Sequence, residues 1–223
     1  AEALIRWHSP SRGLLAPDVF LPVAEELGLI KPITIWMLNS ALRLSSEWTE
    51  QWGALDVSVN IPTKLMEQPD FADVVLSSDG LWGNGNISLC LEVLEQNFVE
   101  DVEGCFKKLK ELRSEGIRIS IDDFGTGYSS LSYFRDIPAD ELKIDRSFVS
   151  NLLEDEANAK IVALIIDLAH KFGLSVVAEG TEDRETLAAL KQLGCDKAQG
   201  YVIAKPMPSE QFGDWLRQFR RHG

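Results

Sequence analysis

The chain has 223 residues, of which 45 % are hydrophobic, and this size and composition suit one domain with a single core. Its formal net charge of −13 at pH 7 repels polyphosphate, so we expect no DNA or RNA partner. No apolar run approaches the ~18–20 residues that a membrane span needs, so we expect no direct membrane insertion of this chain. The three cysteines are widely spaced and suggest no disulfide framework, which predicts a reducing, cytoplasmic compartment.

Short β-rich runs recur along the chain. A first short strand is predicted near Ala3–Trp7, and the later ones are predicted at Leu55–Ile61, Asn86–Val93, Ile117–Asp122, Glu141–Asp145, Leu174–Glu179 and Lys197–Val202. The runs are nearly continuous in apolar residues, as in sheets that are buried on both faces. Helical periodicity fills the segments between them, and this alternation predicts parallel βα units.

Two of the intervening helices have clear ends. The stretch Glu156–Phe172 ends before Gly173, and Glu182–Leu193 ends before Gly194. A glycine just past a helix supplies the left-handed turn through which the chain re-enters the sheet. The apolar face predicted for the first helix consists of Ile161, Leu164, Ile165, Leu168 and Phe172.

These elements predict an α/β fold. Seven strands are one short of a closed (β/α)8 barrel, and an open doubly wound sheet has a similar pattern. We favour a TIM-like (β/α)8 barrel whose first strand is missing from the N-terminus of this chain.

Polar side chains end the predicted strands. In parallel α/β folds the carboxyl ends of the strands form one rim, where functional groups gather. A single Asp or Glu at such a place is usually a helix cap or a solvated turn residue, but a whole set of carboxylates brings like charges together unless a cation neutralises them. Oxygen ligands without His or Cys favour Mg²⁺ or Mn²⁺ over zinc. The residues at the predicted strand ends are Asn60, Glu92, Asp122, Asp123, Asp145, Glu179 and Gln199.

Several segments, among them EALIRW from Glu2 and DDFGTGYSSL from Asp122, resemble the motifs of the EAL domain family of cyclic-di-GMP phosphodiesterases. The most specific is the run DDFGTGYSSL, which begins at Asp122. The other segments follow in the family's order and cover essentially the whole chain: EALIRW from Glu2, SVN from Ser58, EVLE from Glu92, LKID from Leu142, AEGTE from Ala178, QGY from Gln199 and KPMP from Lys205.

The resemblance implies a barrel rim that binds two Mg²⁺ or Mn²⁺ ions and one cyclic-di-GMP. It implies hydrolysis to linear pGpG in bacterial second-messenger signalling. From the oxygen-only ligand set we expect inhibition by Ca²⁺, whose bonds to oxygen are longer. Glu179 and Lys143 would be catalytic, with Glu95 and Glu182 in support. The metal ligands would be Glu2, Asn60, Glu92, Asp122, Asp123 and Glu179. The substrate-binding residues would be Glu2, Leu4, Arg6, Asp145 and Gln199.

Glu95 would brace the loop Phe124–Leu131. Two residues depart from the family pattern, since Leu94 stands where Thr is usual and Thr181 where a small aliphatic residue is usual. Leu94 removes a hydroxyl beside Glu95, so the alternative is a weak or inactive domain that serves as a cyclic-di-GMP receptor or a protein-interaction module.

The resemblance also implies a homodimer. We expect a cytoplasmic protein, either by itself or as the cytoplasmic domain of a larger membrane-anchored signalling protein. The family normally has a further, antiparallel strand before the EAL motif, whereas Glu2 is the second residue here. We therefore expect residues 1–223 to be a single EAL-type phosphodiesterase domain that is incomplete at its N-terminus.

Overall fold

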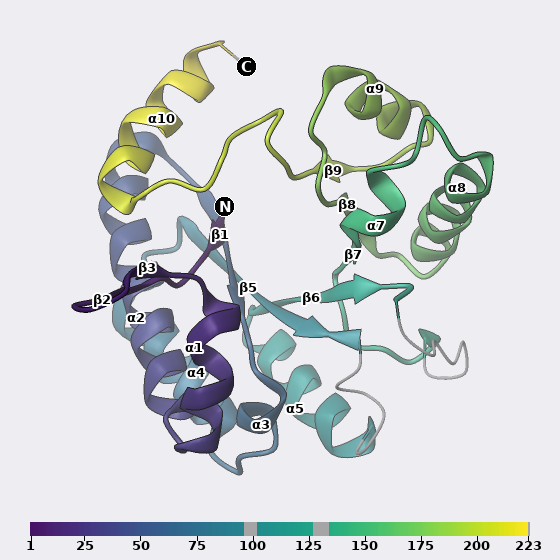
Figure 1. Ribbon diagram of the computed structural model, residues 1–223. Coiled ribbons are helices and arrows are strands. Elements are labelled where there is room, and N and C mark those ends of the chain that lie inside the picture. Colours follow the sequence, from purple (N-terminus) through teal and green to yellow (C-terminus); the bar gives the residue numbers. More distant parts are fainter. Residues whose placement is uncertain (96–101, 127–133, 223) are drawn as a thin grey trace. The chain divides into compact units, whose positions relative to one another are not determined.

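The structure is a computed structural model that describes residues 1–95, 102–126 and 134–222 (Figure 1). The chain divides into two compact units. Unit 1 comprises Ala1–Leu91, Ser114–Ile117 and Met207–Gly223, and unit 2 comprises Glu92–Arg113 and Arg118–Pro206. Strand β5 (Ile87–Leu94) contributes residues to both units.

The sheet of unit 1 has the strand order β1-β4-β5. Strand β1 (Glu2–Ala3) pairs in parallel with β4 (Leu55–Asn60), with Glu2 opposite Ser58. The burial of β4 alternates, so that Val57 and Val59 enter the core while Asn60 remains exposed at the carboxyl end. This alternation follows from the two-residue period of a strand.

The longest helix of unit 1 packs beside β4. Helix α2 (Ile30–Trp52) buries a residue every three or four positions, which gives it one continuous core face that includes Leu38 and Leu42. It ends at Gly53, whose φ of 86° supplies the turn into β4. The other helices of unit 1 are α1 (Pro17–Glu26), α3 (Thr63–Met66), α4 (Phe71–Trp82) and α10 (Ser209–His222).

Helix α10 lies alongside α2 in unit 1 (Figure 1). The ring of Phe212 lies 4.6 Å from that of Trp48, centroid to centroid. Gly213 makes the approach possible, because a Cβ at this position would lie 3.3 Å from the Trp48 indole nitrogen. A C-terminal segment thus completes the core of the N-terminal unit.

A small hairpin in unit 1 was not predicted from the sequence. Strands β2 (Trp7–Ser9) and β3 (Gly13–Leu15) pair antiparallel, with Trp7 opposite Leu15. The Trp7 ring packs edge-on against Phe20 of α1 at 5.9 Å. The predicted strand near Ala3–Trp7 is therefore two short strands, β1 and β2, with a break between them.

The sheet of unit 2 has the strand order β5-β6-β7-β8-β9, and parallel registers join β6 to β9. The strands are β6 (Arg118–Phe124), β7 (Glu141–Ile144), β8 (Ser175–Ala178) and β9 (Lys197–Ala198). The helices are α5 (Val102–Ser114), α7 (Arg146–Val149), α8 (Glu156–Lys171) and α9 (Arg184–Gln192). Strand β7 is fully buried, so the sheet is covered on both faces here, as the apolar runs predicted.

One predicted helix face is wrong in part. Helix α8 buries Val162, Ile165, Ile166 and Ala169, whereas Leu164 is 68 % exposed. The predicted face contained Ile165 but otherwise described a neighbouring stripe, because apolar residues cover more than half of the helix circumference. Among the described residues no helix combines the length and the apolar character of a membrane span.

Candidate active site

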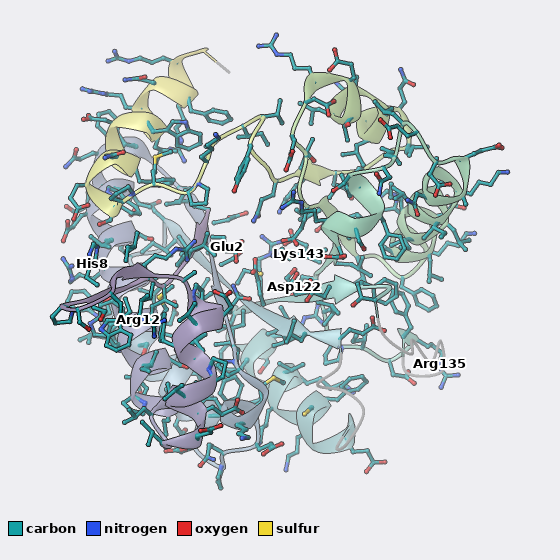
Figure 2. The ribbon with its side chains drawn as sticks, viewed as in Figure 1. Glu2, His8, Arg12, Asp122, Arg135 and Lys143 are labelled. Carbon is teal, nitrogen blue, oxygen red and sulfur yellow. The ribbon has the colours of Figure 1, made fainter. Side chains whose placement is uncertain are left out.

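Lys143 is the centre of the charged cluster in unit 2. It lies on β7 and is 2 % exposed. Its ammonium lies 2.6 Å from a carboxylate oxygen of Glu179, 2.9 Å from Glu92 and 3.4 Å from Asp122. Figure 2 labels Lys143 and Asp122, whose side chains point toward one another. Three strand ends, those of β5, β6 and β8, thus bring a carboxylate to one lysine.

The backbone of β6 is irregular at its two aspartates. Its register with β7 shifts between Ile121 and Phe124, and Asp123 has a φ of 55°. A bulge redirects side chains that would otherwise alternate between the two faces of the sheet. The Asp122 carboxylate accepts a hydrogen bond from the Asp123 backbone N–H at 3.0 Å, which stabilises this conformation.

The bulge creates a group of oxygens that could hold a cation. One carboxylate oxygen each from Asp122, Asp123 and Glu179 lie within 4.8 Å of one another. Burial raises the pKa of Asp123, and the nearby charges of Asp122 and Asp145 raise it further, while Lys143 opposes them. A carboxyl with a raised pKa beside other carboxylates signals negative charge that a bound cation would relieve. The oxygen-only donor set fits Mg²⁺ or Mn²⁺.

The ends of β7 and β8 are joined a second time at the surface. Asp145 caps α7 by accepting a hydrogen bond from the Ser147 backbone N–H at 3.0 Å. Arg146 follows, and its guanidinium donates to Glu182 at 2.9 Å. The Arg146 side chain crosses Gly180, where a Cβ would lie only 2.3 Å from Arg146 Cγ and where φ is +67°. Gly180 therefore has to be glycine for this packing to form.

The end of β9 packs equally closely on the segment after β8. The Gln199 carbonyl accepts a hydrogen bond from the Thr181 N–H at 3.0 Å. A Cβ on Gly200 would lie 2.1 Å from the Thr181 carbonyl oxygen. Gln199 is thus held beside the segment that begins with Glu179. The strand-end pattern predicted Gln199 at the rim, and the family resemblance implied a supporting role for Glu182. Gly180 and Gly200 lie within the AEGTE and QGY motifs, but the close packing that requires them was not predicted, because it depends on tertiary structure.

Glu95 contacts the start of the loop that it was expected to brace. It is 3 % exposed, and its carboxylate accepts a hydrogen bond from the Gly125 N–H at 3.1 Å. The rest of the predicted contact, with residues 127–131, lies outside the described residues. The neighbouring Leu94 is 37 % exposed at the end of β5.

Four of the predicted site residues lie in unit 1. The Asn60 side chain donates to the Glu2 carboxylate at 2.7 Å, so the ends of β1 and β4 bring these two predicted metal ligands together. Leu4 is 40 % exposed, and the exposed Arg6 donates to the Ile5 carbonyl at 2.8 Å.

The cluster in unit 2 has the chemistry of a phosphoester-cleaving site. Glu179 can accept a proton, Lys143 can offset negative charge on a phosphate, and the Asp122–Asp123–Glu179 group can bind a cation. Histidine takes no part in these contacts.

Comparison with known proteins identifies the family. The family model described as "EAL domain" matches residues 1–206. Among curated proteins, the chain is 40 % identical over 211 residues to the bifunctional diguanylate cyclase/cyclic di-GMP phosphodiesterase MucR of Pseudomonas aeruginosa, covering 94 % of this chain and 31 % of MucR. It is 35 % identical over 217 residues to the cyclic di-GMP phosphodiesterase PA2567 of the same bacterium, covering 97 % of this chain and 37 % of PA2567. The chain thus spans about a third of the length of these relatives.

Comparison with solved structures also gives matches to EAL proteins. The PaMucR phosphodiesterase in complex with c-di-GMP matches with a TM-score of 0.88 at 39 % identity, over 95 % of this chain and 86 % of that one. The EAL enzyme Bd1971 matches with a TM-score of 0.88 at 34 % identity, over 96 % and 59 % of the two chains. The predicted TIM-like α/β fold class is confirmed by these matches, and the chain belongs to the EAL domain family.

Proposed function

We propose that this chain is a single EAL-type domain that hydrolyses cyclic-di-GMP to linear pGpG. The observation that carries the proposal is the buried ion-pair cluster in which Lys143 meets Glu92, Asp122 and Glu179. Support comes from relatives that are named cyclic-di-GMP phosphodiesterases and from a matching structure with bound c-di-GMP. Such clusters are costly to bury, so retaining one suggests a function for its charges.

EAL domains are metal-dependent, and the Asp122–Asp123–Glu179 group fits a divalent cation. We propose two Mg²⁺ or Mn²⁺ ions, with Glu92 as a further ligand. Bound ions would lower the pKa of a coordinated water and neutralise charge on the phosphate. The proposed roles of Glu2 and Asn60 as ligands rest on family membership and on the hydrogen bond that joins them.

The protein's own groups would complete the reaction. Glu179 would take a proton from the attacking water on a carboxylate oxygen. The Lys143 ammonium would sit beside the phosphate, where negative charge grows as the P–O bond breaks. Glu2, Leu4, Arg6, Asp145 and Gln199 would hold the dinucleotide. Glu95 and Glu182 would support the site through their bonds to Gly125 and Arg146.

Product analysis tests the proposal. The protein should convert cyclic-di-GMP to pGpG with Mg²⁺ or Mn²⁺, and EDTA should abolish turnover. Ca²⁺ should inhibit, because its longer and more variable bonds place a ligand water differently. Turnover that persists after exhaustive EDTA treatment would contradict the metal requirement.

A second candidate is a cyclic-di-GMP receptor with little or no turnover. Leu94 favours it, because an exposed apolar side chain stands beside Glu95 where the family usually has a hydroxyl. Binding of cyclic-di-GMP in Mn²⁺ without any product would favour the receptor, and Leu94→Thr should then raise the rate.

We further propose a cytoplasmic homodimer that pairs through α8. The exposed Ile161 and Leu164, with the half-buried Leu168, form an apolar stripe with spacings of three and four residues. The stripe therefore suits an apolar contact with a second copy of the chain.

A further inference from the structure

Lys143 and a bound cation would use the same carboxylates. Two of the three carboxylates in contact with the Lys143 ammonium, those of Asp122 and Glu179, also belong to the group that could hold a metal ion. The third, Glu92, is 3 % exposed and lies 2.9 Å from the ammonium. The lysine is therefore positioned where it affects every cation that approaches this group.

The side chain of Lys143 cannot easily avoid this conflict. It is 2 % exposed and projects from the central strand of three, since β7 pairs with β6 on one side and β8 on the other. Moving a buried ammonium away from its carboxylates would leave charge unpaired in a region of low polarity. A divalent cation that binds to Asp122 and Glu179 is consequently repelled by the fixed positive charge of Lys143. This repulsion is stronger in the buried site than it would be in water.

The formal charges show how much of the attraction Lys143 removes. Glu92, Asp122 and Glu179 sum to −3, and the ammonium reduces this sum to −2. Addition of Asp123 makes the sum −3 with the lysine and −4 without it. The lysine therefore reduces the negative charge available to a metal while keeping the carboxylates together.

We propose that Lys143 is an internal competitor of the divalent cation and sets the affinity of the site for metal. The proposal rests on the proposed function, because it assumes that Asp122 and Glu179 bind the ion. It adds a second role for Lys143, one exerted before any substrate is present: metal binds reversibly, and the metal concentration then controls the fraction of protein that is loaded.

Mn²⁺ titration of the protein without nucleotide tests this role, with free Mn²⁺ followed by its electron paramagnetic resonance signal. Lys143→Met removes the charge, and Mn²⁺ should then bind at least roughly tenfold more tightly. Lys143→Gln should act in the same direction, because it also lacks the charge but keeps hydrogen-bond donors. Lys191→Met is the matched control: it removes an exposed lysine of α9 in the same unit and should change the affinity by less than about twofold.

Asp122→Asn should abolish tight Mn²⁺ binding at the cluster. The Mn²⁺ that this variant still binds measures the contribution of other acidic groups. Unchanged or weaker Mn²⁺ binding in both Lys143 variants would overturn the proposal and leave Lys143 as an organiser of ligands. If Lys143→Met folds only when Mn²⁺ is present, the ion has replaced the lysine as the countercharge, which supports the proposal. A variant that stays unfolded even with Mn²⁺ leaves the decision to Lys143→Gln. Absence of turnover in the wild type would refute the proposed activity without affecting these titrations.

Discussion

Glu179 makes the shortest of the three contacts with Lys143, at 2.6 Å, and its backbone N–H donates to the Ile144 carbonyl at 3.1 Å. The strand end that carries Glu179 is thus bonded to the strand end that carries Lys143 through both side chain and backbone. A general base has to be held in this way, because proton transfer depends on distances of a few tenths of an ångström.

We predict that Glu179→Gln lowers kcat by at least ~10²-fold, the low end of the contribution of acid–base catalysis. Glutamine has nearly the same shape and keeps one oxygen that can ligate a cation, but it cannot take the proton, so the loss in kcat should exceed the loss in cyclic-di-GMP affinity. Asp122→Asn should instead weaken Mn²⁺ binding, and substrate binding with it. Steady-state kinetics and calorimetric binding separate the two effects. Equal losses of affinity in both variants would mean that Glu179 is chiefly a ligand.

The hydroxyl of Thr181 is a buried polar group that affects stability. It is fully buried, and its hydroxyl has no hydrogen-bond partner among the described residues. Burying an unpaired hydroxyl is unfavourable, and valine has the same shape without this penalty. The departure from the family pattern at this position therefore has an identifiable energetic cost.

Thr181→Val should stabilise the protein by about 1 kcal/mol, measured as a higher denaturation midpoint at constant m-value. Thr186→Val is the matched comparison. Thr186 is also buried, but its hydroxyl donates to the Asp183 carboxylate at 3.0 Å, so the same change should lower the midpoint. A loss of stability in Thr181→Val would show that the hydroxyl does have a partner, such as a buried water.

At the scale of elements, the sequence predicts best where local and tertiary signals agree. Strand β5 begins and ends within one residue of its predicted bounds, and α8 ends one residue before the predicted position, just ahead of Gly173. Glycine turns and apolar strands are local signals. The β2–β3 hairpin was missed because Trp7 and His8 lack strict alternation. The buried face of α8 was predicted in part wrongly because apolar residues cover more than half of its circumference.

The candidate site, like the fold, could be predicted from the sequence only in part. Carboxylates at strand ends could be located from the sequence because parallel topology brings the ends together. The bulge at Asp123 could not, because a positive φ in an aspartate depends on the register between β6 and β7. The approach of Arg146 to Gly180 likewise depends on how two loops pack, which no local pattern encodes.

Asp79 of α4 and Asp70, which precedes this helix, provide a pH test with opposite signs. Burial raises the pKa of Asp79 above its ordinary 3.8, so its contribution to stability is full below that value and is lost as pH rises through the raised pKa. A hydrogen bond from Lys31 lowers the pKa of Asp70, the residue before the helix. Its contribution is present above pH 3.8 and is lost as pH falls through the lowered pKa.

Asp79→Asn should therefore gain stability relative to the wild type as pH rises from about 3 to about 7. Asp70→Asn should lose relative stability over the same range. Urea denaturation at both ends of the range measures the two trends. Parallel trends in the two variants would contradict the assignment of burial as the cause for Asp79.

At the scale of the whole molecule, charge is the main constraint. The proposed substrate is a dianionic dinucleotide, and a chain with a net charge of −13 needs positive charge at the site that would bind it. Lys143 supplies one buried positive charge, and the Asp122–Asp123–Glu179 group offers a place for more. Under the proposed function, metal dependence is thus the expected consequence of the protein's acidic charge.

The α8 stripe makes a prediction about assembly. Leu164→Glu should convert the dimer to a monomer, because it places a charge at the centre of the proposed contact. Leu81→Glu is a close control, since Leu81 of α4 is 67 % exposed against 68 % for Leu164. Light scattering measures the mass of each. A wild type that is monomeric at all concentrations, or a Leu164→Glu dimer, would rule out pairing through this stripe.

The measurement that tests the central claim most directly is the mass of the product formed in ¹⁸O-labelled water. Hydrolysis by an attacking water breaks one P–O bond of cyclic-di-GMP and transfers the water oxygen to phosphorus. With Mn²⁺ present, the account predicts linear pGpG carrying one ¹⁸O in its terminal phosphate, and a Glu179→Gln sample that forms it at least ~10²-fold more slowly. Intact cyclic-di-GMP after prolonged incubation, or pGpG without the label, would contradict the account.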